Sequence, residues 1–262
     1  MRPREALRKN RSAFHTQLCG GLLRFCADDN ATNVHILGPR RERITRQVAK
    51  KLGASSGLPV EGSIPEMYFE KACEEFIRRS LLASASQSAR CFTVARLSDA
   101  ALEAPGLESY PELKELRCLV RANSELAARI RHCFFYPDIL VFRPFVGDKK
   151  IGGLHLHASI SCKWTIRSDR TQNSRSEALN LIRNRKGHTP HIVVVTAEPL
   201  PSRLASICLG TGDIDCVYHF ALPELTETVS NLDYLDAADM LKTLVEGRRL
   251  RDISDLPLDL AV

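Results

Sequence analysis

The chain has 262 residues, of which 44% are apolar and 26% are charged, an ordinary globular composition that can bury a sizeable core. No apolar run approaches the roughly 18 residues that a membrane-spanning helix requires, which argues against a membrane protein. The basic N-terminus, MRPREALRKNRSAFH, lacks the apolar centre of a secretion signal, so we expect a cytoplasmic protein.

Net charge and cysteine content indicate what kind of partner and what kind of cysteine chemistry to expect. The formal net charge is +6 and the isoelectric point is near 8.9, which suits a polyanionic partner but is also common among soluble enzymes. The nine cysteines are odd in number and show no CxxC spacing. This pattern favours reduced, mostly buried thiols over a disulfide framework or a zinc site.

Helical periodicity dominates the first half of the chain. Apolar residues recur at helical spacing in four segments, 4–26, 41–53, 66–84 and 110–133. Gly53 is a helix stop, and it opens a connector rich in glycine, serine and proline, GASSGLPVEGSIP. One face of the third segment carries Phe69, Cys73, Phe76 and Ile77, a spacing that indicates a helix.

The second half alternates between strand and helix periods. Strands are predicted over 134–142, 154–164, 191–198 and 216–222, and helices over 174–187 and 223–249. We expect Ser174 or Ser176 to cap the first of these helices and Gly187 to end it. This order predicts an α/β fold with a sheet flanked by helices. We expect a single domain over 1–262, with a helical part at about 1–133 and a catalytic α/β core at about 134–262.

The predicted strand over 154–164 carries the first candidate for chemistry. Period two places Leu154, Leu156, Ala158, Ile160 and Cys162 on one face, and His155, His157, Ser159, Ser161 and Lys163 on the other. A lysine at the end of such a face is suited to stabilise an anionic transition state or orient a water. For the strand alone, however, a solvated polar face is the commoner explanation. The two histidines have no third ligand spaced nearby, so a metal site there is the minor alternative.

Two carboxylates flank this strand along the chain. Asp138 follows Pro137 at a strand start, where it could simply satisfy a turn. Glu177 lies on the next predicted helix, where a surface charge is the commoner role. Together with Lys163 they form a different set, because two carboxylates suit Mg²⁺ and an ammonium suits a phosphate. The three residues therefore point to metal-assisted phosphodiester hydrolysis.

The strand is followed by a run of charges, RSDR. Its arginines, Arg167 and Arg170, have the planar fork that matches guanine in the major groove, and Asp169 is able to accept from cytosine. The cluster is therefore a candidate reader of adjacent C·G and G·C pairs. A salt-bridged surface turn is the alternative that composition leaves open.

These segments resemble the NgoMIV family of restriction endonucleases, which cut within CCGG cores. The resemblance rests on LHASISCKWTIRSDR, RSEALNLIRNRKG, PHIVVVTAEP, LGTGDIDCVYHFAL and LRDISDLPLDLAV, and so covers roughly Leu154 to Val262. In the N-terminal part the best correspondence is FEKACEEF, around Glu70. The resemblance implies a restriction-endonuclease-like core with a central mixed sheet and a variant of the PD-(D/E)XK nuclease site.

The resemblance also assigns roles to individual residues. In this variant site Ser161 takes the place of the acid that normally precedes the lysine by two residues, and Glu177 supplies that carboxylate from the helix. The implied catalytic residues are Asp138, Lys163, Glu177 and Glu70. The implied Mg²⁺ ligands are Asp138, Glu177 and the Cys162 main-chain carbonyl. The implied DNA-binding residues are Arg167, Asp169, Arg170, Arg203 and Ser161, with Arg203 at the outer base pair.

The resulting expectation is a Mg²⁺-dependent type II restriction endonuclease that cleaves double-stranded DNA at a CCGG-core palindrome, with GCCGGC as the full site. A palindrome calls for at least a homodimer. The connection between Asp138 and Ser161 is shorter than in the family, where it helps join two dimers, so we expect a dimer with a tetramer as alternative. The loop that reads the outer base pair has no secure counterpart beyond Asp28 and Asp29 nearby. A structure-directed repair nuclease and a non-cleaving DNA-binding protein are the alternative functions.

Overall fold

A computed structural model describes most of the chain. The described residues are 3–21, 38–54, 65–84, 92–96, 137–144, 154–166, 168–185, 187–210 and 212–261. The predicted helix over 110–133, and the candidates Asp28, Asp29 and Arg167, lie outside them. No helix within the described parts is both long enough and apolar enough to cross a membrane.

The described strands form one mixed sheet whose spatial order follows the chain, from β1 to β6. The strands are β1 (Thr93–Arg96), β2 (Ile139–Pro144), β3 (Leu154–Lys163), β4 (His191–Thr196), β5 (Cys216–His219) and β6 (Leu250–Asp252). The first three pair antiparallel, and β3 to β6 pair parallel. The predicted α/β class is confirmed. The edge strands β1 and β6 were not predicted, because runs of four and three residues show too little alternation to be recognised.

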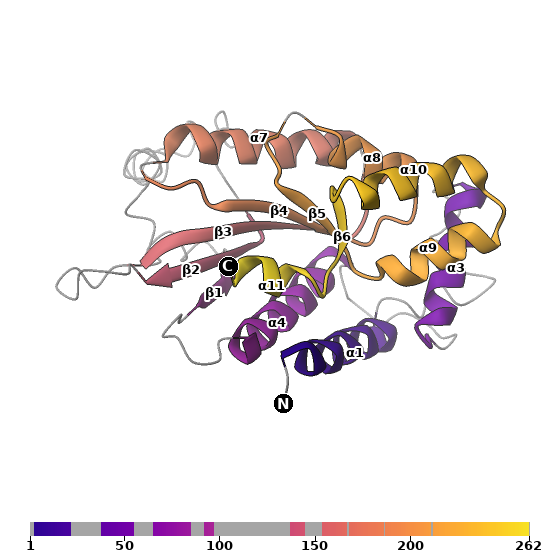
Figure 1. Ribbon diagram of the computed structural model, residues 1–262, viewed down its shortest axis with the longest axis horizontal. Helices are drawn as coiled ribbons and strands as arrows, with labels where there is room; N and C mark the ends of the chain where they lie inside the picture. Colours follow the sequence, from indigo (N-terminus) through magenta and orange to yellow (C-terminus); the bar gives the residue numbers. More distant parts are fainter. Residues whose placement is uncertain are drawn as a thin grey trace.

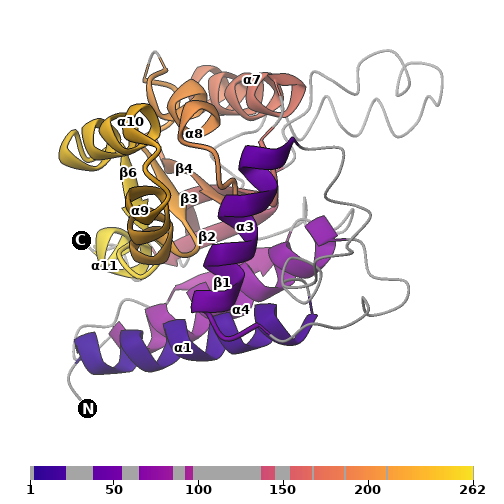
Figure 2. The ribbon, with the colours of Figure 1, turned by 90° about the vertical axis from the view of Figure 1, so that its right-hand side faces the viewer.

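Helices cover both faces of the sheet (Figure 1). They are α1 (Pro3–Gly21), α3 (Pro39–Lys51), α4 (Pro65–Ser84), α7 (Ser168–Asn184), α8 (Pro201–Cys208), α9 (Leu222–Asn231), α10 (Leu235–Glu246) and α11 (Leu256–Leu260). The helices α7, α8 and α10 lie on one side, and α4 and α1 lie on the other. Figure 2 shows α1 and α4 side by side, with α3 crossing near α9. The predicted inward face of α4 is confirmed, since all four of its residues are buried in the main core.

The predicted two faces of β3 are wrong over half of the strand. Opposite β2, Val141 pairs with Ala158 but Phe142 pairs with Leu156, so His157 is an extra residue in a bulge. Leu156 therefore packs against α7 in a small second cluster, whereas Ala158 belongs to the main core. Strict alternation fails because a bulge exchanges the faces on its two sides.

His157 consequently leaves the face that carries Ser161 and Lys163. Its Nε2 lies 2.8 Å from the Leu260 carbonyl of α11, and its ring lies 5.5 Å from that of Phe92. The predicted polar face is thus divided into a histidine end and a serine–lysine end. Packing and this hydrogen bond account for His157.

Two helix boundaries also differ from the sequence prediction. Helix α7 begins at Ser168, so Ser174 and Ser176 lie inside it and neither caps it. The predicted long helix over 223–249 is two helices, α9 and α10, separated where Asp233 takes a positive φ of 53°. Both errors arise where the chain offers no glycine or proline to mark the boundary.

Candidate active site

The carboxyl end of β3 brings together two of the predicted site residues. Because β2 runs antiparallel to β3, the residue that precedes β2 lies opposite the end of β3. Asp138 is that residue, and its Oδ2 accepts from the Cys162 main-chain N–H at 2.6 Å and from Lys163 Nζ at 3.0 Å. Both partners of this ion pair are mostly shielded from solvent, with side-chain exposures of 18% and 16%.

Helix α7 adds the second carboxylate. Ser174, Glu177, Ala178 and Leu181 follow the spacing of one helix face, and Ala178 and Leu181 pack against the sheet. Glu177 is therefore directed at the polar end of β3, where the Ser161 hydroxyl lies 3.4 Å from its Oε2. Asp138, Ser161, Lys163 and Glu177 thus meet at one edge of the sheet, as predicted from the sequence.

Burial and mutual charge perturb both ionisable partners. Burial raises the pKa of Glu177 to about 7, and the negative charge of Asp138 adds to the rise, while Lys163 and the Ser161 hydroxyl oppose it. Burial acts to lower the pKa of Lys163, but the charges of Asp138 and Glu177 outweigh it, so that pKa is raised. Lys163 is therefore cationic at neutral pH, and Glu177 lacks full compensation for its charge.

The donor set fits a hard divalent cation. Within the described residues no three His, Cys, Asp or Glu side chains are grouped to hold a metal. The end of β3 offers two carboxylates, those of Asp138 and Glu177. Two carboxylates with main-chain and substrate oxygens are a set that Mg²⁺ accepts, because it retains several waters. The incompletely compensated Glu177 is also what a nearby cation would stabilise.

The Cys162 carbonyl has the right orientation for such a set. The N–H and C=O of one strand residue point to the same side of the strand. The Cys162 N–H points at Asp138, so its carbonyl faces that side as well. The next residue points the opposite way, since the Lys163 carbonyl accepts from Ala197 beyond β4 at 3.3 Å. The Cys162 thiol is buried, and burial raises its pKa well above the ordinary value, so it is not a nucleophile.

Glu70 lies on the other side of the sheet from Glu177. It is half-buried on α4, next to Phe69, whose ring centroid lies 5.4 Å from that of Trp164. Helix α4 packs on β3, so Glu70 lies on the α4 side of that strand, and its implied catalytic role stays a prediction.

The candidate DNA-reading residues lie where β3 passes into α7. Of Asp169 and Arg170 only the main chain is described, and it forms the first turn of α7. Arg203 of α8 donates from Nη1 to the Ile166 carbonyl at 2.8 Å, directly before Arg167. The structure therefore places Arg203 directly before the segment that carries the candidate DNA-reading residues Arg167, Asp169 and Arg170.

Sequence reasoning missed one ionisable pair beside this segment. The Glu198 carboxylate is fully buried after β4 and accepts from Arg41 Nη2 of α3 at 2.8 Å. Burial raises the pKa of Glu198, although Arg41 opposes the rise. The one available signal was an acid at the end of a continuous apolar run, HIVVVTAE, where a charge needs a partner. Nothing in the pattern of α3 marks Arg41.

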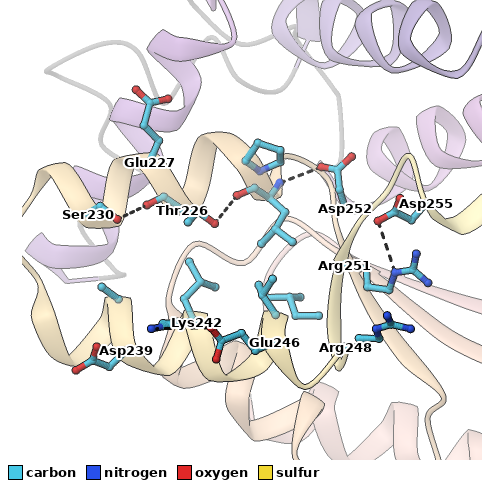
Figure 3. Close-up of a pocket in the computed structure, with 16 residues that line it drawn as sticks. Thr226, Glu227, Ser230, Asp239, Lys242, Glu246, Arg248, Arg251, Asp252 and Asp255 are labelled. Carbon is cyan, nitrogen blue, oxygen red and sulfur yellow. Dashed lines mark hydrogen bonds and ion pairs between the residues drawn. The ribbon is translucent and has the colours of Figure 1, made fainter. Parts of the chain in front are cut away.

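A groove of about 1000 Å³ lies elsewhere, between α9, α10 and β6 (Figure 3). Its walls include Thr226, Lys242, Glu246 and Arg251, and none of the predicted site residues lines it. The predicted chemistry depends on the ionised groups at the end of β3, and so this groove is not the candidate active site.

Comparison with known proteins gives the same identification. The family described as "NgoMIV restriction enzyme" matches residues 153–262. A relative from Neisseria gonorrhoeae, "Type II restriction enzyme NgoMIV", is 42% identical over 284 aligned positions, which cover 97% of this chain and 98% of that enzyme. The similarity thus extends well beyond the segment from Leu154 to Val262 that carried the resemblance.

A solved structure described as "Restriction endonuclease PspGI-substrate DNA complex" also matches. It covers 89% of this chain and 96% of that chain, at 14% identity and a TM-score of 0.29, a score that carries no weight here. The relative matched over 97% of this chain and the residues at the end of β3 identify the family. The chain belongs to the NgoMIV family of type II restriction endonucleases, enzymes that bind DNA and cleave it at specific sites.

Proposed function

We propose that this enzyme uses Mg²⁺ to cleave double-stranded DNA at a palindrome with a CCGG core, with GCCGGC as the full site. The observation that carries the proposal is the grouping of Lys163 with Asp138 and Glu177 at the end of β3. An ammonium between two carboxylates gives both signs of charge that phosphodiester hydrolysis requires. The cell compartment that fits a DNA substrate is the cytoplasm.

Each residue has a separate role in this proposal. Asp138, Glu177 and the Cys162 carbonyl hold the cation, and Ser161 supports Glu177 through its hydroxyl. Mg²⁺ bound there supplies a Lewis acid that withdraws negative charge from the phosphate oxygens. Lys163, kept cationic by its two carboxylates, orients the attacking water or contacts the scissile phosphate.

Recognition of the DNA sequence is assigned to residues Arg167 to Arg170, called the recognition segment, which end in the first turn of α7. Arg167 and Arg170 contact guanines of the core, and Asp169 accepts from the paired cytosines. Arg203 contributes at the outer base pair, and Ser161 lies close enough to the site to approach the DNA. The N-terminal turn of α7 begins five residues after Lys163, so base reading and catalysis share one short segment.

Two alternatives are disfavoured by particular residues. A non-cleaving DNA-binding protein has no need for the Lys163–Asp138 contact and the buried Glu177. A structure-directed repair nuclease has no need for the arginine-rich segment beside the site. The restriction enzyme accounts for both features.

The direct test is digestion of a plasmid of known sequence with Mg²⁺, followed by sequencing of the ends. We expect double-strand breaks at one palindrome with a CCGG core, and no breaks in EDTA. Ends at unrelated sequences would contradict the proposed recognition, and cleavage in EDTA would contradict the metal requirement.

Assembly is a separate part of the proposal. Two active sites are required to cut both strands of a palindrome, so we propose a dimer in solution. The short connection between Asp138 and Ser161 removes area that a stable tetramer would need, since stable interfaces bury at least ~1,000 Å². Light scattering at micromolar protein tests this, and a stable tetramer without DNA would contradict it.

A further inference from the structure

A short segment links Lys163 to the residues proposed to read the DNA. Within it, both the main-chain N–H and the main-chain carbonyl of Ile166 are hydrogen-bonded to side chains. Ile166 follows Lys163 by three positions and directly precedes Arg167. Its N–H donates to Glu198 Oε2 at 2.9 Å, and its carbonyl accepts from Arg203 Nη1 at 2.8 Å. Its side chain is 2% exposed, so the residue is fixed by packing as well.

Glu198 is itself fixed by groups from three other places in the chain. Its Oε2 also accepts from Arg41 of α3, and its Oε1 accepts from the Leu200 N–H at 3.2 Å. The side chains of Arg41 and Glu198 are 2% and 0% exposed. A buried carboxylate with three donors has little freedom to move, because each displacement leaves a charge or an N–H without its partner.

Because the link is short, fixing Ile166 also restricts where the recognition segment can lie relative to Lys163. Three residues span at most about 10 Å, so a shift of Ile166 moves Arg167 and the first turn of α7 relative to Lys163. A displacement of about 1 Å from a distant change can cost about 100-fold in an enzyme rate. The position of Ile166 therefore matters for any reaction that requires base reading and phosphate chemistry at the same time.

We propose that Glu198, held by Arg41, is a positioning residue for sequence discrimination: it fixes Ile166 and thereby sets the recognition segment against the catalytic lysine. This inference rests on the proposed role of Arg167 to Arg170 in reading the core. It assigns to Arg41 of helix α3, which precedes Arg167 by 126 positions, a part in choosing the DNA site.

The competing explanation is that the ion pair only stabilises the fold. Removing one member of a buried pair is strongly destabilising, so single substitutions do not separate the two explanations. Replacing both members by neutral residues of similar volume avoids the unpaired charge. Two such double variants differ in whether the side chain at position 198 keeps an oxygen that can accept from the Ile166 N–H or the Leu200 N–H.

The first variant, Arg41→Met with Glu198→Gln, keeps an amide oxygen that can accept from Ile166. The second, Arg41→Met with Glu198→Met, keeps the volume but has no acceptor. For each we would measure kcat and KM on a CCGG-core duplex and on duplexes with one core mismatch. A destabilised control is Arg11→Met, which removes a guanidinium that bonds to Glu224 and Asp252 and not to Ile166 or the Glu198 carboxylate.

We expect the glutamine variant and the Arg11 control to keep the wild-type ratio of cognate to mismatched kcat/KM within about threefold. The methionine variant should lose about 10- to 100-fold of that ratio. Equal ratios in both double variants, whether retained or lost, would overturn the proposal, because the acceptor would then make no difference.

Hydrogen exchange gives a second measurement that does not depend on cleavage. In the methionine variant a peptide covering 164–170 should exchange at least about 10-fold faster than in wild type, while peptides of β4 stay protected. If the double variants fail to fold, slow exchange of the Ile166 amide in the wild-type enzyme supports the link, and fast exchange there overturns it. A wild type that shows no preference for a CCGG core would refute the proposed function, whereas the exchange result judges the positioning role separately.

Discussion

At the C-terminal end of β3 the Lys163 ammonium lies 3.0 Å from Asp138, whereas nearer the other end the His157 ring hydrogen-bonds to the Leu260 carbonyl at 2.8 Å. The C-terminal end brings ionised groups together, because Glu177 of α7 also lies beside it. The second end buries a neutral ring, because burial lowers the pKa of His157 to about 4 despite the bond to Leu260. One strand therefore carries charged chemistry at one end and neutral packing at the other.

The difference shows what alternation in a strand can and cannot specify. His157, Ser159, Ser161 and Lys163 look equivalent in the sequence, since each occupies every second position. The bulge at His157 turns the histidine toward α11 and leaves the other three toward α7. A comparison of the two ends predicts that mutations at one affect activity and mutations at the other affect stability.

The largest effect is expected at the catalytic end. Asp138→Ala and Glu177→Ala should each lower the cleavage rate by at least about 10²–10³-fold, because each removes a carboxylate from the metal set. DNA binding without metal should stay close to wild type in both variants. The melting temperature should fall in Asp138→Ala, because the shielded Lys163 ammonium and the Cys162 N–H lose their acceptor, and it should change less in Glu177→Ala. The measurement is plasmid nicking at fixed enzyme concentration, alongside DNA binding and thermal unfolding.

An exposed carboxylate provides the control for this experiment. Glu246 on α10 is 68% exposed at its side chain and remote from the end of β3, so Glu246→Ala should cleave at the wild-type rate. Full nicking activity in folded Asp138→Ala or Glu177→Ala protein would show that the metal site has been assigned to the wrong residues.

Lys163→Ala should lower the cleavage rate almost as much as the carboxylate substitutions do, but for a different reason. An ammonium that acts on water or phosphate is not a metal ligand, so excess Mg²⁺ cannot replace it. We expect a folded protein whose cleavage remains at least about 10²-fold below wild type across a Mg²⁺ titration. Recovery at high Mg²⁺ would instead mean that Lys163 serves mainly to support the carboxylates.

The catalytic end was predictable because its chemistry is local in sequence. Asp138 precedes β2, Lys163 ends β3 and Glu177 lies within α7. These are three consecutive elements with clear periods, so the convergence of the three residues follows from the order of the elements. The resemblance to the family then assigned their roles. The same holds for the buried face of α4, which a period of 3.6 identifies without any tertiary information.

The parts that could not be predicted depend on contacts between distant residues. The bulge at His157 requires the register with β2, and the partner of Glu198 comes from α3, 157 positions away. The start of α7 at Ser168 was not predicted, because the charged residues there are also typical of a surface turn. Each of these features is set by pairing or packing that a single stretch of sequence does not contain.

The histidine end should produce a moderate effect on stability and none on chemistry. The unfolded His157 takes up a proton near its ordinary pKa of 6.5, whereas the folded one does so only near 4. Between these values the unfolded state binds more protons, so the free energy of unfolding falls as the pH falls, and it changes little from this cause above or below that window. The full difference is at most about 3 kcal/mol.

The test is urea unfolding of wild type and His157→Gln at pH 7 and pH 5. The glutamine can still donate to the Leu260 carbonyl but does not titrate, so its loss of stability between the two pH values should be smaller by about 1–2 kcal/mol. His219, whose pKa is also lowered to about 4 by burial, leaves some acid sensitivity in both proteins. An unchanged pH dependence would mean that His157 is not buried as a neutral ring, and a loss of cleavage activity would break the contrast between the two ends.

The smallest effect is expected from Ser161, which tests how far the catalytic end extends along β3. Its hydroxyl lies 3.4 Å from Glu177, a long hydrogen bond whose removal should cost at most about 1 kcal/mol. Ser161→Ala should therefore slow cleavage by about 2- to 5-fold, and extra Mg²⁺ should recover most of the loss, because the carboxylate remains. Ser159→Ala is the matched control, since Ser159 is 4% exposed on the same side of the strand and one step further from Lys163.

The two serines also separate support of Glu177 from contact with DNA. If Ser161 acts through Glu177, its substitution changes the Mg²⁺ concentration for half-maximal cleavage and leaves metal-free DNA binding unchanged. If it touches DNA, binding weakens in EDTA and extra Mg²⁺ has no effect, so the role in supporting the carboxylate would be rejected. Equal rates in Ser159→Ala and Ser161→Ala would mean that the catalytic end begins only at Cys162 and Lys163, because the hydroxyl nearest to Glu177 would then contribute no more than the one beyond it.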